Sequence, residues 1–155
     1  MPRKKWNSMA RHRGFRRDFV YIADKNFIKR QKAAASERPE LSDCWIATIL
    51  EIRAEDKDHV YARIYWMYAW NDLPKPAQSA LKNVRFDNPN ELIASNHMDV
   101  INVISVVDKA TVHQRSARTG YEAADELYWS FALDYVTSKV FMQKVPASSN
   151  HSSAT

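Results

Sequence analysis

Apolar residues alternate with polar ones, or form short apolar runs, in several segments of the chain, and such patterns predict β-strands. The clearest segments are residues 45–52 (W-I-A-T-I-L-E-I) and residues 59–68 (H-V-Y-A-R-I-Y-W-M-Y). Residues 55–58 (E-D-K-D) between them have the polar composition of a turn, so these two strands are predicted to form a hairpin. Further strands are predicted at residues 19–22, 91–95 and 100–107.

One segment fits two structures. Residues 127–133 (L-Y-W-S-F-A-L) have apolar positions that, together with Ala123 and Ala124, suit a helix. Their aromatic residues, Tyr128, Trp129 and Phe131, suit a strand equally well. Counting this segment, the pattern predicts about five or six strands and no internal repeat.

The polar segments divide the chain into one domain and two tails. Residues 24–42 and the proline-containing residues 71–90 are predicted loops, the first with room for a helical turn. Residues 1–17 are predicted to be a disordered basic arm, and residues 146–155 (A-S-S-N-H-S-S-A-T after a proline) a disordered tail. Residues 18–145 then form the folded domain, predicted to be mostly β, a small distorted barrel with long loops and short helical pieces.

The composition excludes several classes of function. With 2 glycines in 155 residues, the chain lacks the glycine-rich loops that bind nucleotide phosphates. The single cysteine, Cys44, excludes an intrachain disulfide and a cysteine-rich zinc module, and it favours a reducing compartment. No apolar run approaches the roughly 20 residues that span a bilayer, and no apolar stretch follows the basic N-terminus as in a secretory signal. We therefore expect no metal, no cofactor and no membrane association.

The positive charge is concentrated in the arm. Residues 1–17 contain seven Lys and Arg and no acidic residue, whereas the remainder has 16 basic and 18 acidic residues. This imbalance predicts a polyanion near the arm, such as DNA bound weakly and without sequence preference. A solubilising or nuclear-import tail explains the same charges equally well. The predicted nucleic-acid contacts are Arg3, Lys4, Lys5, Arg11, Arg13, Arg16 and Arg17.

Aromatic residues are concentrated in residues 61–70 (Y-A-R-I-Y-W-M-Y-A-W), which hold five of the 18 aromatics. On a strand, Trp66 and Tyr68 point to the same face, about 7 Å apart. Two such ring walls can bind a quaternary ammonium group, such as methyl-lysine, by cation–π attraction. Packing in an ordinary sheet core is the alternative, and composition by itself favours it.

Three blocks of sequence resemble a known family. They are residues 45–52, residues 60–68 with the following D-L-P, and residues 90–101 (N-E-L-I-A-S-N-H-M-D-V-I). Over residues 19–140 the chain resembles the bromo-adjacent homology (BAH) domain and is most similar to fungal BAH proteins that continue into a PHD finger. A single cysteine leaves no PHD finger in this chain. The family's E-L-x-x-S-x-H-x-D pattern is matched by Glu91, Leu92, Ser95, His97 and Asp99.

The resemblance implies a nuclear, chromatin-associated protein with a distorted β-barrel. Members that read trimethyl-lysine on the histone H3 tail in polycomb-type repression use three aromatic residues, which correspond here to Trp45, Trp66 and Tyr68. Their peptide groove is bordered by residues corresponding to His97 and Asp99. The R-P-E that follows the aromatic strand in relatives is absent, so Asp72 would have to supply the acidic neighbour. Implied partners are a histone tail or nucleosome and subunits of a chromatin complex.

Enzyme functions are poorly supported by the sequence. Ser95, His97 and Asp99 are close together, but no nucleophile-elbow sequence surrounds the serine. His59, His97 and His113 lack metal-ligand spacing. Two hypotheses remain: a reader of methylated lysine, and a BAH scaffold that binds proteins or the nucleosome surface without recognising methyl-lysine.

Overall fold

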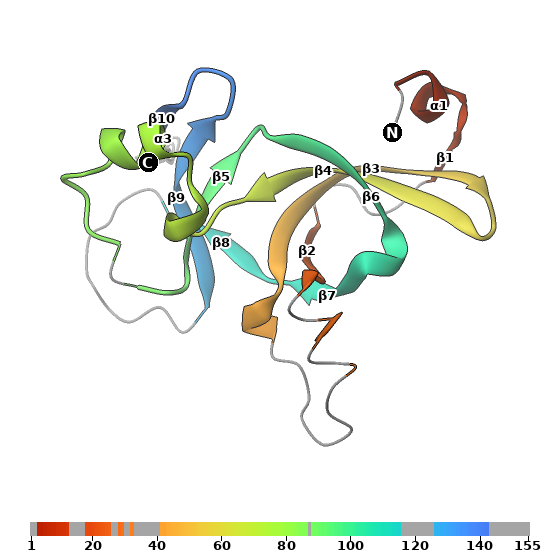
Figure 1. The fold of residues 1–155 in the computed structure, drawn as a ribbon, viewed down its shortest axis with the longest axis horizontal. Coiled ribbons are helices and arrows are strands. Elements are labelled where there is room, and N and C mark those ends of the chain that lie inside the picture. Colours follow the sequence, from red (N-terminus) through yellow and green to blue (C-terminus); the bar gives the residue numbers. More distant parts are fainter. Residues whose placement is uncertain are drawn as a thin grey trace, which may run out of the picture.

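The computed structural model describes residues 3–12, 18–25, 28–29, 32, 41–86, 88–115 and 126–142. Within these ranges the chain consists mainly of β-strands with short helical pieces (Figure 1). The helical pieces are α1 (Arg3–Ser8), η1 (Leu41–Asp43), η2 (Trp70–Asp72), α3 (Lys75–Ala80) and η3 (Val103–Ser105). The strands are β1 (Ala10–His12), β2 (Phe19–Ile22), β3 (Trp45–Asp56), β4 (His59–Met67), β5 (Glu91–Ser95), β6 (Met98–Asn102), β7 (Val106–Ala110), β8 (Val112–Gln114), β9 (Leu127–Asp134) and β10 (Lys139–Met142).

The predicted hairpin is the centre of the first sheet. Strands β3 and β4 pair antiparallel, and the sheet order is β6-β4-β3-β2-β7, with β1 also paired to β3. Ala62 and Ile64 of β4 are fully buried and pack with residues of β2 and β3, such as Val20 and Ile49. Trp66 on the same face is only partly buried, although it packs against two core clusters. The alternation predicted for β4 is therefore confirmed.

The second sheet has the order β10-β9-β5, and β8 pairs with β9. The ambiguous residues 127–133 are thus a strand, β9, whose Phe131 and Leu133 are buried. The end of β4 connects the two sheets: Tyr68 and Ile93 exchange backbone hydrogen bonds of 2.8 and 2.7 Å. The mostly-β prediction is confirmed, but the described strands form two joined sheets in which barrel closure is not detected.

Two local predictions are wrong. Residues 100–107 are not one strand: the chain leaves β6, turns through η3 and re-enters the first sheet at its other edge as β7. The side chain of Asn102 caps this turn by accepting from the backbone N–H of Ile104 at 3.1 Å. Residues 71–90, predicted as a loop, contain η2 and α3, because proline is tolerated in the first turn of a helix.

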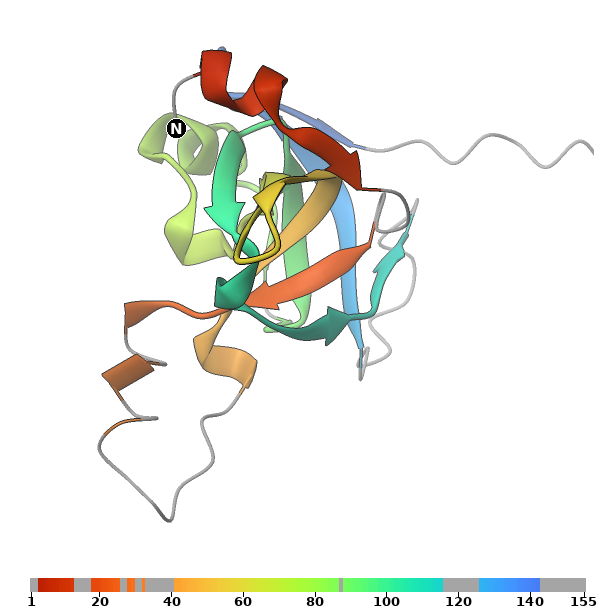
Figure 2. The same cartoon turned by 90° about the vertical axis from the view of Figure 1, so that its right-hand side faces the viewer.

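The prediction of a disordered arm is wrong for residues 3–12. Strand β1 pairs with the far end of β3, and α1 lies beside the hairpin turn, away from the second sheet (Figures 1 and 2). Trp6 is 5% exposed, and the Arg53 guanidinium lies 5.1 Å from its ring centroid and donates to its carbonyl oxygen at 2.8 Å. A buried aromatic residue therefore anchors the arm. Residues 13–17 and the predicted tail, 146–155, lie outside the described residues.

Candidate functional site

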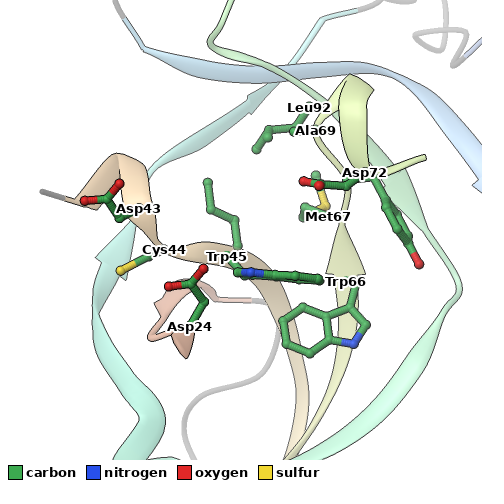
Figure 3. Close-up of a pocket in the computed structure, with 11 residues that line it drawn as sticks. Asp24, Asp43, Cys44, Trp45, Trp66, Met67, Ala69, Asp72 and Leu92 are labelled. Atoms are coloured by element: carbon green, nitrogen blue, oxygen red, sulfur yellow. The ribbon is translucent and has the colours of Figure 1, made fainter. Parts of the chain in front are cut away.

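A pocket of about 310 Å³ lies where β3 begins and β4 ends (Figure 3). It combines aromatic, apolar and acidic side chains. In Figure 3, Asp24, Asp43 and Cys44 lie on one side of Trp45, and Met67, Asp72 and Leu92 on the other. The lining residues are Asp24, Asp43, Cys44, Trp45, Ile46, Trp66, Met67, Tyr68, Ala69, Asp72 and Leu92.

The two tryptophans of the pocket are brought together by strand register. Ala47 of β3 is opposite Trp66 of β4, so Trp45, two residues earlier on the same face, is the diagonal neighbour of Trp66. Their ring centroids are 5.3 Å apart and their planes make an angle of 68°. Trp45 is 45% exposed, although a large aromatic residue usually packs in the core. This edge-to-face pair leaves indole surface available to a ligand.

Tyr68, the third predicted aromatic, also lines the pocket but is 8% exposed. Its hydroxyl is hydrogen-bonded to Nδ1 of His97 at 2.5 Å. Burial, together with the nearby Tyr135 and Asp72, raises the pKa of Tyr68 to about 12. The residue is therefore a neutral phenol at physiological pH, held in place by the sheet junction and by His97.

Three acidic residues line the pocket, and the sequence predicted only one of them, Asp72. The other two, Asp24 and Asp43, lie beside Cys44. Burial, together with these two carboxylates, raises the pKa of Cys44 to about 11, so the thiol stays protonated. Asp24 follows β2, whose Ile22 pairs with Trp45. The pairing of β2 with β3 brings Asp24 close to Trp45, and no pattern in the sequence predicts that pairing.

The predicted groove residues His97 and Asp99 do not line the pocket; they support its rings. Asp99 accepts a hydrogen bond from the Trp66 indole N–H at 3.4 Å, and His97 bonds to Tyr68 as described. Ser95 adds a third contact, since its hydroxyl donates to the carbonyl oxygen of Trp66 at 2.5 Å. The S-x-H-x-D residues therefore hold the aromatic end of β4 in position.

We expect His97→Ala to lower the free energy of unfolding by about 1–2 kcal/mol, because it removes the partner of a buried hydroxyl. Adding Tyr68→Phe should recover part of this loss by removing the hydroxyl itself. Urea denaturation of the single and double variants measures both effects. A double variant no more stable than His97→Ala would contradict the supporting role of this hydrogen bond.

The basic residues predicted to contact nucleic acid do not all lie in the same surroundings. Lys5 pairs with Glu55 at 3.1 Å, and Arg11 pairs with Glu51 at 2.7 Å, so both cations face the hairpin. Arg3 is exposed in α1, and Lys4 belongs to the same helix. Arg13, Arg16 and Arg17 lie outside the described residues. DNA binding by the arm stays a prediction.

No group of three or more His, Cys, Asp or Glu side chains in the described part of the chain could hold a metal ion. No helix within the same ranges is long and apolar enough to cross a membrane.

The fold and the pocket describe a small two-sheet β-module with a partly open aromatic and acidic site. No family model matches the sequence, and no curated protein matches it either. The crystal structure of the yeast Rsc2 BAH domain matches the fold with a TM-score of 0.52 and 13% sequence identity. The match covers 83% of this chain and 48% of that one, so this chain spans about half its length. The chain has the fold of a BAH domain, as the sequence resemblance predicted.

Proposed function

We propose that this protein is a nuclear, chromatin-binding module that recognises a methylated lysine of a histone tail in the pocket formed by Trp45, Trp66 and Tyr68. The observation that carries the proposal is the edge-to-face pair formed by the exposed Trp45 and the partly buried Trp66, both of which line an acidic pocket. The BAH fold agrees with a binding module rather than an enzyme. The H3 tail, in a repressive chromatin context, is the partner that the sequence resemblance suggests.

Physical chemistry explains why such a pocket suits methyl-lysine. Methylation removes hydrogen-bond donors from the ammonium group and spreads its charge, which lowers the cost of leaving water. Indole faces then attract the cation through their quadrupoles, and tryptophan gives the strongest attraction of the aromatic side chains. The carboxylates of Asp24, Asp43 and Asp72 add a negative potential at the same place.

The direct test is calorimetric titration of the full chain with H3-tail peptides in methylated and unmethylated forms. We expect methylated peptide to bind at least about fivefold more tightly, which corresponds to about 1 kcal/mol and is the lower range of a partly exposed cation–π contact. Equal binding of both forms, or no binding by folded protein, contradicts the proposal. A scaffold without methyl-lysine recognition is then the better description.

A further inference from the structure

Two tyrosines of β4, Tyr61 and Tyr65, belong to neither the pocket nor the core. They do not line the pocket, and they are absent from the three hydrophobic clusters of the described residues. We propose that these tyrosines, with Arg63 between them, form a binding surface for single-stranded nucleic acid. This surface is separate from the pocket, so the proposal does not rest on methyl-lysine recognition.

Strand geometry places the three side chains on one face of β4. Residues 61, 63 and 65 alternate with the buried Ala62 and Ile64, so they point away from the core cluster that those two residues join. All three are partly buried, and successive side chains are about 7 Å apart along the strand. Trp66 belongs to the opposite face of the strand, together with Ile64.

The polar groups of these side chains are available to a ligand. Within the described residues, the hydroxyls of Tyr61 and Tyr65 have no hydrogen-bond partner, and their rings stack on no other ring. The guanidinium of Arg63 donates from Nε to the sulfur of Met98 at 2.7 Å, a weak acceptor, and has no carboxylate partner in the same ranges. Most donors of Arg63 therefore stay free for a phosphate or a base.

The neighbouring strands add positive charge to the same face, because residues directly opposite each other in an antiparallel pair share a face. Arg53 of β3 is opposite Tyr61, and Arg11 of β1 is opposite Arg53. Glu51 is opposite Arg63 and forms ion pairs with the other two arginines. Three arginines thus surround one carboxylate, and the positive excess attracts a polyanion.

Alternating aromatic and cationic side chains suit a single strand better than a duplex. Unpaired bases stack on aromatic rings, while a guanidinium contacts phosphate or stacks on a base. The spacing of about 7 Å is about twice the 3.4 Å rise per nucleotide in a duplex strand, so each ring can receive a separate, unstacked base. The bases of a duplex are already stacked and paired. Binding by charge alone favours the duplex, which has the higher charge density.

The test is fluorescence anisotropy of the full chain with a short labelled oligothymidine and with a DNA duplex of the same length, both at one salt concentration. We expect the single strand to bind more tightly than the duplex. Tyr61→Leu and Tyr65→Leu, which keep an apolar side chain, should each weaken single-strand binding by at least about fivefold and leave duplex binding unchanged. Arg63→Gln should weaken single-strand binding and lower the slope of its logarithmic salt dependence by about 0.7.

Two variants in the second sheet are matched controls. Phe141 is an exposed aromatic residue of β10, and Lys139 is an exposed cation of the same strand. Phe141→Leu and Lys139→Gln should leave the preference for the single strand unchanged. Thermal unfolding of each variant verifies that it is folded.

The proposal is overturned if wild type binds the duplex as tightly as the single strand or more tightly, or binds neither. It is also overturned if both folded tyrosine variants keep the wild-type affinity, or if Phe141→Leu weakens single-strand binding as much as they do. Tyr61→Leu should bind methylated H3 peptide as wild type does, since Tyr61 does not line the pocket. Failure of this proposal therefore leaves the proposed function intact, and the reverse also holds.

Discussion

Trp66→Ala is expected to abolish the preference for methylated over unmethylated peptide. Trp66 contributes one wall of the pocket, and the other exposed wall, Trp45, is in edge-to-face contact with it at 5.3 Å. A partly exposed cation–π contact contributes about 1 kcal/mol, so the affinity for methylated peptide should fall by about fivefold or more. Unmethylated peptide should lose much less. Calorimetry with both forms of one peptide measures the ratio.

Trp70→Ala is the control for this variant. Trp70 lies four residues later in the same segment and stacks on Phe86 at 4.7 Å, but it does not line the pocket. Its loss should reduce stability and leave the methylation preference in place. If Trp70→Ala removes the preference as completely as Trp66→Ala does, the effect is one of folding, and the pocket is not the binding site.

Trp6→Ala is expected to lower the free energy of unfolding by about 3 kcal/mol, in the range typical of a buried tryptophan. The variant removes the 5% exposed ring on which Arg53 lies and leaves an apolar gap between α1 and the hairpin. The pair formed by Arg53 and Glu51, both largely buried, would then be more open to water. Urea denaturation measures the change.

Arg3→Ala provides the comparison in the same helix. Arg3 is exposed, and surface substitutions of this kind usually change stability by less than about 0.5 kcal/mol. Similar, small effects of the Arg3 and Trp6 variants would mean that α1 is not docked in solution. The prediction of a disordered arm would then be correct for residues 3–12.

Much of the fold could be predicted from local pattern. The period of two in β4 placed Ala62, Ile64 and Trp66 on one face, and the structure buries the first two. The polar residues between β3 and β4 located the hairpin turn, because a turn depends on a few neighbouring residues. Residues 127–133 could not be assigned in this way, since the strand is selected by pairing with β5, β8 and β10, and β5 and β8 are distant in sequence.

The prediction of disorder was wrong for residues 3–12 because it depended on the positive charge of the arm and not on the residues that these positions contact. A run of basic residues is typical of a disordered tail, yet Lys5 and Arg11 pair with Glu55 and Glu51 of β3. Trp6 adds the apolar burial that offsets the entropy lost on ordering. Those contacts join residues forty or more positions apart, which no local pattern reveals.

The sequence by itself determined the strands of the first hairpin and, with the family resemblance, which aromatic residues to examine. Side-chain alternation and turn composition are local properties, so they can be predicted from neighbouring residues. The tertiary structure decided which residues surround those aromatics. It brought Asp24 to the pocket through the pairing of β2 with β3, and it placed Ser95, His97 and Asp99 beside the end of β4 as supports. These contacts depend on strand register between distant segments, which the packing of the whole core fixes.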